Sequence, residues 1–100
     1  MVRGGYVYLM TNKNNTVLYT GVTSELRDRV YDHKIHYYSN SFTSRYRIHK
    51  LVYYEGFDSM EEAISRERQL KGGSRKKKIE LVEKMNPKWI DLFDQIPVGE

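Results

Sequence analysis

Hydrophobic and polar positions alternate along three segments of the chain. Residues 6–11, 17–22 and 51–55 are rich in tyrosine and β-branched side chains, as expected for strands. The asparagine-rich stretch 12–15 between the first two segments favours a turn, because asparagine tolerates left-handed backbone conformations. The first two strands are therefore predicted to form a hairpin, and the third strand is expected to join the same sheet.

Apolar residues recur at helical spacing in three further segments, each preceded by a residue that can cap a helix. The predicted caps are Thr23 or Ser24, Ser59 and Ser74. Glu62, three residues after Ser59, completes a capping box. The first helix is expected to run to about His36, and the polar stretch 37–47 is expected to form a loop. The order strand, strand, helix, strand, helix, helix predicts a small α/β layer fold with helices covering a three-stranded sheet.

The composition limits the class of protein. A chain of 100 residues is expected to form a single domain over residues 1–100, and the absence of cysteine excludes disulfides and thiolate metal sites. The net charge is +4 and the pI is about 9.3, which is compatible with a polyanionic partner. No segment has the length of an apolar membrane span and no signal peptide is recognisable, so a cytoplasmic location is expected.

Two tyrosines fall on the same side of the predicted hairpin. If the turn is centred on Lys13 and Asn14, Tyr8 lies directly opposite Tyr19, with Cβ atoms roughly 5 Å apart. Such a pair is usually a packing contact, but it can also supply a general base and a hydroxyl group that orients a phosphate. Gly21 supports the second interpretation, because a glycine within a strand often marks the close approach of another group.

Arg29 and His33 are four residues apart and therefore share one face of the first predicted helix. On most helices such a pair lies on the solvent-exposed face. An arginine, however, can hold two phosphate oxygens and stabilise charge that develops in a transition state. A histidine beside it can relay a proton. Both residues are therefore candidates for the chemistry of a phosphodiester.

Glu67 lies among the apolar positions of the second predicted helix, where a charge is costly unless a positive group meets it. It can pair with a lysine or an arginine, or the helix can be rotated so that Glu67 is exposed. Alternatively, it can bind Mg²⁺ or Mn²⁺. Magnesium often takes one or two protein carboxylates and completes its coordination with water and substrate phosphate.

A run of positive charge, formed by Arg75, Lys76, Lys77 and Lys78, opens the third predicted helix. Such a run is usually a solvated helix face. It can also contact the phosphate backbone of a nucleic acid without reading its sequence. Both interpretations are compatible with the sequence.

These residues, in this order, resemble the GIY-YIG nuclease family. Tyr6-Val7-Tyr8 stands where the first family motif stands, and Tyr19-Thr20-Gly21 stands where the second does. Arg29 and His33 match the motif of the following helix, and the segment 62–71 matches the helix that carries the family's metal-binding carboxylate. The resemblance covers nearly the whole chain, and the joint spacing of the motifs is more specific than any one of them.

The resemblance implies an α/β (α+β) fold in which helices flank a three-stranded antiparallel sheet. It also implies hydrolysis of DNA phosphodiesters with one divalent metal ion, Mg²⁺ or Mn²⁺. A motif tyrosine, Tyr8 or Tyr19, would act on the attacking water, Arg29 would hold the phosphate, and Glu67 would hold the metal. Which of the two tyrosines is the base stays open.

Two departures from the family pattern point to alternatives. Val22 follows Gly21, where some family members carry a lysine close to the catalytic tyrosine, and the 100 residues hold no second, DNA-binding module. Binding of DNA is therefore expected to be weak and poorly specific. One alternative is a nucleic-acid-binding module with the nuclease fold and little or no catalysis. Another is a protein-interaction module in which the tyrosines only pack.

Overall fold

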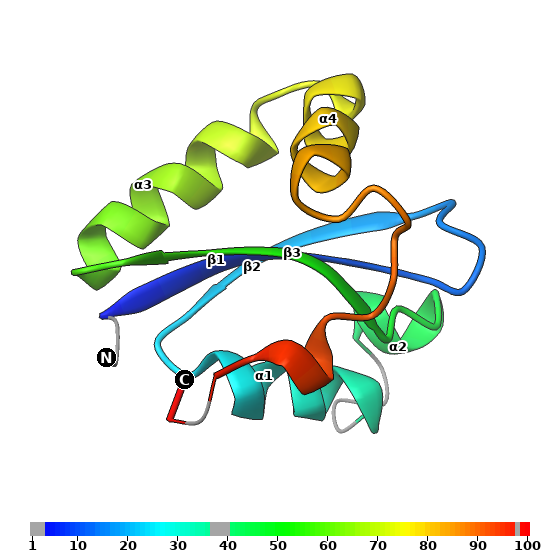
Figure 1. Cartoon of the computed structure of the whole chain (residues 1–100), viewed down its shortest axis with the longest axis horizontal. Helices are drawn as coiled ribbons and strands as arrows, with labels where there is room; N and C mark the ends of the chain where they lie inside the picture. The colour runs from blue at the N-terminus through cyan, green and yellow to red at the C-terminus, as the bar shows by residue number, and fades with distance from the viewer. Residues whose placement is uncertain (1–3, 37–40, 98) are drawn as a thin grey trace.

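The computed structural model describes residues 4–36, 41–97 and 99–100. Its elements in chain order are β1 (Gly5–Thr11), β2 (Leu18–Thr23), α1 (Leu26–Lys34), α2 (Phe42–Arg45), β3 (Lys50–Phe57), α3 (Met60–Lys71), α4 (Arg75–Met85) and a 3-10 turn, Phe93–Gln95. The strands form one antiparallel sheet in the order β2-β1-β3. Helices α3 and α4 lie on one face of this sheet and α1 lies on the other (Figure 1). The predicted fold class is therefore confirmed.

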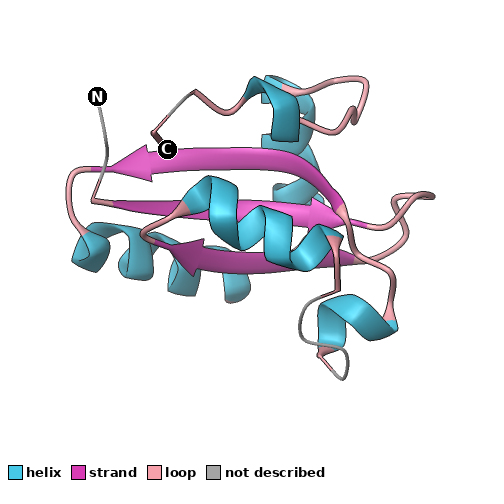
Figure 2. Cartoon of the chain, turned by 90° about the horizontal axis from the view of Figure 1, so that it is seen from below, coloured by secondary structure: helices cyan, strands magenta, loops and turns pink. Residues whose placement is uncertain are grey.

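The central strand β1 is buried on both faces, so its alternate side chains enter two separate cores. Tyr6, Tyr8 and Met10 pack toward α1 and the C-terminal segment, in a cluster with Leu26, Val30, Leu92 and Ile96. Val7 and Leu9 face the opposite way, toward the apolar sides of α3 and α4, where Ala63, Leu70 and Val82 are buried. Seen from below, α1 lies over the sheet and runs roughly along its strands (Figure 2). Tyr8 is thereby held between the sheet and α1.

The predicted hairpin forms, but its predicted register was wrong. Tyr8 is paired with Gly21, and Tyr19 is paired with Met10. The hairpin closes later than expected because the Asn12 side chain takes part in the turn: its Oδ1 accepts hydrogen bonds from the backbone N–H of Thr16 at 2.8 Å and of Val17 at 3.3 Å. A shift of two residues keeps every side chain on its face. The two tyrosines therefore still share a face, but diagonally.

Helix α1 is shorter than predicted and begins later. Its N-cap is Glu25, which makes no capping hydrogen bond with its side chain, so the prediction of a cap at Thr23 or Ser24 was wrong. Thr23 is still the last residue of β2, and its Oγ1 accepts a hydrogen bond from the backbone N–H of Glu25 at 3.0 Å. The threonine is used to close the strand-to-helix turn instead.

The stretch predicted to be a loop contains the short helix α2. Ser41 caps it by accepting a hydrogen bond from the backbone N–H of Ser44 at 3.3 Å. The helix covers only four residues, so the sequence is too short there to show the helical spacing of apolar residues. The rest of the predicted loop, residues 37–40, lies outside the described residues.

The caps predicted for the two later helices are confirmed. Ser59 accepts a hydrogen bond from the backbone N–H of Glu62 at 3.2 Å and donates its hydroxyl to the Glu62 carboxylate at 3.1 Å. Ser74 accepts a hydrogen bond from the backbone N–H of Lys77 at 3.2 Å. Over the described residues, none of the helices combines the length and the apolar character that a bilayer-crossing helix needs.

Candidate active site

A cleft with a volume of about 480 Å³ opens beside the edge strand β2, between α1 and α2. Its lining residues are Tyr19, Arg29, His33, Ser41, Phe42 and Thr43. Tyr19 comes from the hairpin, Arg29 and His33 from successive turns of α1, and the other three from the start of α2. The structure thus brings together residues from three elements that local sequence patterns leave separate.

Tyr8 lies directly beneath this cleft. Its ring centroid is 6.2 Å from that of Tyr19 and 5.9 Å from that of His33, and Tyr19 meets His33 edge-on at 5.3 Å. The residue is fully buried, with 0% of its surface exposed. Tyr19, in contrast, is only partly buried and lines the cleft. The two tyrosines are therefore neighbours with different access to solvent.

A chain of hydrogen bonds holds the imidazole of His33. The Tyr8 hydroxyl lies 3.0 Å from Nε2, and the Thr43 hydroxyl lies 2.9 Å from Nδ1. Ser41 Oγ is in turn 3.1 Å from Thr43 Oγ1. Both ring nitrogens therefore have partners, so the ring cannot turn without breaking a buried hydrogen bond. Pairs such as Arg29 and His33 usually lie on the solvent-exposed face of a helix, but His33 is buried here, with 3% of its surface exposed.

Gly21 makes room for the Tyr8 ring. A Cβ atom at this position would lie 2.3 Å from Cζ of Tyr8 and 2.4 Å from its hydroxyl oxygen. Because Tyr8 is paired directly with Gly21, its ring lies across the glycine, and any larger residue would displace it. The spacing of the two motifs therefore has a steric cause. A contact between Gly21 and nucleic acid remains a prediction.

Burial is the largest influence on Tyr8, and it raises the pKa of this phenol well above its ordinary range. The phenol of Tyr19 and the charge of Glu67 raise the pKa of Tyr8 further. Arg29 hydrogen-bonds to Tyr8 and carries a positive charge, and both effects lower that pKa without overcoming burial. Tyr8 is therefore a protonated phenol near neutral pH, and its hydroxyl serves as a hydrogen-bonding group.

His33 is neutral for a similar reason. Burial, followed by the positive charge of Arg29, lowers the pKa of His33 from 6.5 to about 4. His36 lowers the pKa of His33 slightly, whereas Asp32 opposes the shift. A neutral imidazole donates one hydrogen bond and accepts another, which matches its two hydroxyl partners.

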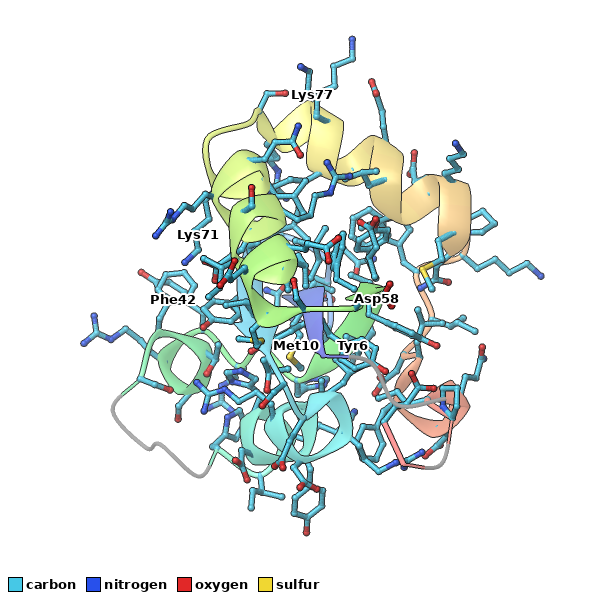
Figure 3. The ribbon with its side chains drawn as sticks, turned by 90° about the vertical axis from the view of Figure 1, so that its left-hand side faces the viewer. Tyr6, Met10, Phe42, Asp58, Lys71 and Lys77 are labelled. Atoms are coloured by element: carbon cyan, nitrogen blue, oxygen red, sulfur yellow. The ribbon has the colours of Figure 1, made fainter. Side chains whose placement is uncertain are left out.

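Glu67 approaches the site from α3, on the other face of the sheet. Its carboxylate lies 3.3 Å from Nζ of Lys71, and its side chain is only 15% exposed. Figure 3 shows Lys71 and Phe42 projecting on the same side of the molecule, one from α3 and the other from α2. Glu67 does not line the cleft itself, but its charge is close enough to raise the pKa of Tyr8.

The residues present fit a magnesium or manganese ion held by a single protein carboxylate. The Glu67 carboxylate supplies oxygen donors, which these hard cations prefer, and its side chain is 15% exposed. No group of three or more histidine, cysteine, aspartate or glutamate side chains forms a metal cluster within the described part of the chain. Glu67 would therefore act with water and substrate phosphate rather than within a protein cage.

The basic run lies away from the cleft, on α4. Its residues are mostly exposed, and Lys77 points away from the sheet at the far end of the molecule (Figure 3). The Arg75 guanidinium donates to the backbone carbonyls of Asn15 at 3.4 Å and Thr16 at 3.2 Å, which ties α4 to the hairpin turn. The contact of this run with nucleic acid remains a prediction.

Three residues of the cleft were missed by the sequence patterns, namely Ser41, Phe42 and Thr43. They matter because Thr43 holds His33 and Phe42 extends the aromatic wall begun by Tyr19, with ring centroids 6.2 Å apart. The one local signal is Ser41, a residue type that often caps helices. No pattern in the sequence connects it with His33.

The sheet, the flanking helices and the cleft together form a nuclease-like domain. A family model described as the GIY-YIG catalytic domain matches residues 4–80. The chain belongs to the GIY-YIG family.

Several relatives carry the name UPF0213 protein. The one from Syntrophus aciditrophicus is 38% identical over 82 residues, which span 82% of this chain and 92% of that protein. The one from Staphylococcus haemolyticus is 37% identical over 78% of this chain and 93% of its own length. The solution NMR structure of the UPF0213 protein from Bacillus halodurans is similar in fold, with a TM-score of 0.53 and 31% identity over 85% of this chain and 88% of that chain. These names state no activity.

Proposed function

We propose that this protein is a divalent-metal-dependent endonuclease that hydrolyses DNA phosphodiesters. The observation that carries the proposal is the convergence of Tyr19, Arg29 and His33 on one cleft, with Tyr8 directly beneath them. Membership of the GIY-YIG family supports it, because the matched model describes a catalytic domain.

Tyr19 is the proposed general base. It is the tyrosine that lines the cleft, whereas Tyr8 is fully buried and reaches no solvent. In the proposed step, the Tyr19 oxygen takes a proton from a water molecule as that water attacks phosphorus, and the phenolic proton passes to solvent. The bond from phosphorus to one sugar oxygen breaks, and that oxygen takes a proton from solvent. A phenol needs a neighbouring cation for this task, and Arg29 lines the same cleft.

Tyr8 is proposed to act as a positioning residue. Its pKa is raised by burial, so it keeps its proton and holds His33 through the 3.0 Å hydrogen bond to Nε2. Thr43 holds the opposite nitrogen of the ring. The imidazole is thereby fixed edge-on to Tyr19, where it can orient the scissile group.

Arg29 is the proposed phosphate clamp. A guanidinium presents paired donors that match two phosphate oxygens, and it can stabilise the charge that develops as water adds to phosphorus. Arg29 is also close enough to the buried Tyr8 to lower the pKa of its phenol, so the clamp and the buried tyrosine are neighbours. Replacement of Arg29 by lysine would keep the positive charge but lose the paired donors that match two phosphate oxygens.

Glu67 is the proposed metal ligand. A bound Mg²⁺ or Mn²⁺ ion would polarise the phosphate and neutralise part of its charge. The role of the protein would be to hold the Glu67 carboxylate near Tyr8, and the packing of α3 on β1 and β2 supports this role. Lys71 keeps this partly buried carboxylate paired, at 3.3 Å.

Substitution of Glu67 tests the proposal. Glu67→Gln should lower cleavage by about 100-fold or more, since even groups that only support a metal ligand change activity or affinity by 10–100-fold. The matched control is Glu61→Gln, an exposed glutamate on the same helix. Both variants and the parent would be incubated with supercoiled, linear, branched and single-stranded DNA, with Mg²⁺ or Mn²⁺ and with chelator.

Calorimetric titration of Mn²⁺ provides a readout that does not depend on cleavage. The parent and Glu61→Gln should bind the ion, and Glu67→Gln should bind it at least tenfold more weakly. Equal cleavage by Glu67→Gln and the parent would overturn the assignment of Glu67. Absence of any cleavage by the parent would overturn the proposed enzyme activity.

A second candidate function is a nucleic-acid-binding module with little catalysis. The observation that favours it is the ion pair between Glu67 and Lys71, which partly neutralises the proposed metal ligand. Such a module would bind DNA with an affinity that falls steeply with salt, and would give no product at any Mg²⁺ or Mn²⁺ concentration. With a net charge of only +4, either candidate is expected to bind DNA weakly and with little sequence preference.

A further inference from the structure

Two large rings, one on α2 and one at its C-cap, are exposed beside the cleft. Phe42 is 49% exposed and Tyr46 is 45% exposed, and their centroids are 4.7 Å apart. Phe42 also lies over Tyr19, with centroids 6.2 Å apart and the ring planes inclined by only 29°. The three rings form a continuous row, the aromatic ridge (Tyr19, Phe42 and Tyr46), which leads from the cleft to the surface. Contiguous apolar surface of this kind usually marks a binding site.

A second hollow adjoins the outer end of this ridge. This basic groove has a volume of about 400 Å³ and is lined by Asn12, Lys13, Asn14, His36, Tyr46, Arg47 and His49. Phe42 lines the cleft and Tyr46 lines the groove, so the contact between their rings joins the two hollows. Among the described residues, the lining of the groove includes two basic side chains, Lys13 and Arg47, and no carboxylate. It is therefore suited to an anionic ligand.

Two residues of the basic groove directly follow helix C-caps, and one of them also carries a buried polar atom without a described partner. Arg47 follows Tyr46, the C-cap of α2, and its positive φ of 55° closes the helix: its N–H donates to Ser44 O at 3.2 Å, and the N–H of Ile48 donates to Thr43 O at 2.8 Å. His36 has a φ of 54°, and its Nδ1 is buried without a hydrogen-bond partner among the described residues. A buried polar atom without a partner calls for an explanation, and a bound ligand is one group that can supply the missing hydrogen bond.

We infer that the aromatic ridge stacks an unpaired nucleobase next to the scissile phosphate, while Lys13 and Arg47 hold the phosphates of the strand that continues from it. The substrate class is then DNA with a single-stranded segment beside the cut, such as a branch, a flap or a gap. The inference rests on the proposed function, because it takes the cleft as the place of cleavage.

The chemistry of the ridge favours an unpaired strand over an intact duplex. In a duplex each base is stacked on its neighbours, so its flat face is not available to a protein ring. A splayed base exposes that face, and stacking on an aromatic side chain does not depend on sequence. Arginine and lysine beside the rings add attraction to the backbone, as in other single-strand sites. A site for duplex backbone alone would need the positive charges but not the rings.

The test measures binding in chelator, so that cleavage plays no part. Fluorescence anisotropy would give the affinity of the parent for duplex, single-stranded and branched DNA of one sequence. The double variant Phe42→Ala/Tyr46→Ala should lose about tenfold or more in affinity for the single-stranded and branched forms. The ratio of those affinities to the duplex affinity should fall accordingly. The control is Tyr31→Ala, which removes an equally exposed tyrosine from α1 and should leave all affinities unchanged.

Two further measurements distinguish stacking from a general loss of structure. Phe42→Trp keeps an aromatic face and should retain the affinity for single-stranded DNA. A fluorescent base analogue in the unpaired segment should be quenched on binding to the parent and not on binding to the double variant. Equal loss for duplex and single strand, or no loss for either, would overturn the inference. A parent that cuts duplex and branched DNA equally would also overturn it, while leaving the proposed endonuclease activity intact.

Discussion

The two tyrosines of the site lie in opposite surroundings although they share one hairpin and one face. Tyr8 is fully buried between Gly21 and His33, and burial raises its pKa. Tyr19 lies at the surface of the cleft, against Phe42 and the edge of His33. The site is thus built in two layers. The buried layer fixes positions, and the open layer is available to a substrate. Substitution of Tyr8 and substitution of Tyr19 are therefore expected to have different effects, although the two residues look equivalent in the motifs.

The largest expected effect comes from removing the hydroxyl of the open layer. Tyr19→Phe should lower cleavage by about 100-fold or more, because a general base contributes 10²–10⁴-fold. Its stability should stay within about 0.5 kcal/mol of the parent, since Tyr19 is only partly buried and lines the open cleft. The measurements are single-turnover cleavage and urea unfolding.

Tyr8→Phe is the matched control for that prediction. It should cost stability, about 1–2 kcal/mol, because it leaves Nε2 of the buried His33 without its partner. Its cleavage should fall less than that of Tyr19→Phe. The opposite order of the two cleavage losses would show that the roles of the tyrosines are reversed.

Enlarging the residue that faces Tyr8 should disturb the buried layer. Gly21→Ala places a Cβ atom 2.3 Å from Cζ of the fully buried Tyr8 ring. Overpacking of this kind costs about 1–3 kcal/mol, and the displaced ring would also shift His33. Urea unfolding would measure the loss of stability.

Gly73→Ala is the control for this steric effect, because its Cβ would meet its nearest neighbour, the backbone oxygen of Leu70, at an ordinary distance of 3.4 Å. It should change stability by less than about 0.5 kcal/mol. Equal stability of Gly21→Ala and the parent would mean that the Tyr8 ring can move, and that the buried layer is not rigid.

Acid should weaken the buried layer through His33. Its pKa is lowered from 6.5 to about 4 in the folded protein, so between these values the unfolded chain binds more protons than the folded one. The stability that His33 contributes is therefore complete above pH 6.5 and is lost as the pH falls toward about 4. The loss should be on the order of 2 kcal/mol.

Urea unfolding at neutral pH and at the acid end of this window would measure the effect. His33→Gln has no titrating ring, so its stability should fall less over the same pH range. The difference between the two proteins gives the contribution of His33, because the carboxylates titrate in both. Identical pH dependence of the parent and His33→Gln would assign the acid sensitivity to other groups.

The sequence by itself determined the features that depend on neighbouring residues. The strand pattern and the serine caps at Ser59 and Ser74 are local, because a cap needs only the backbone a few residues ahead. The spacing of Arg29 and His33 likewise places them on one face of α1, whatever the helix packs against. The motif spacing was specific enough to indicate the family, which the matched domain model confirms.

Only the tertiary structure decided which residues meet and which are buried. The hairpin register depended on the side chain of Asn12, and the rigid imidazole depended on Thr43, which lies in a helix too short to show a period. The approach of Glu67 to Tyr8 depended on how α3 packs across the sheet, and the steric role of Gly21 depended on the ring paired with it. Burial and distance between segments far apart in the chain are set by packing, and packing is a property of the whole fold. The same two tyrosines could therefore be found in the sequence, but their different surroundings could not.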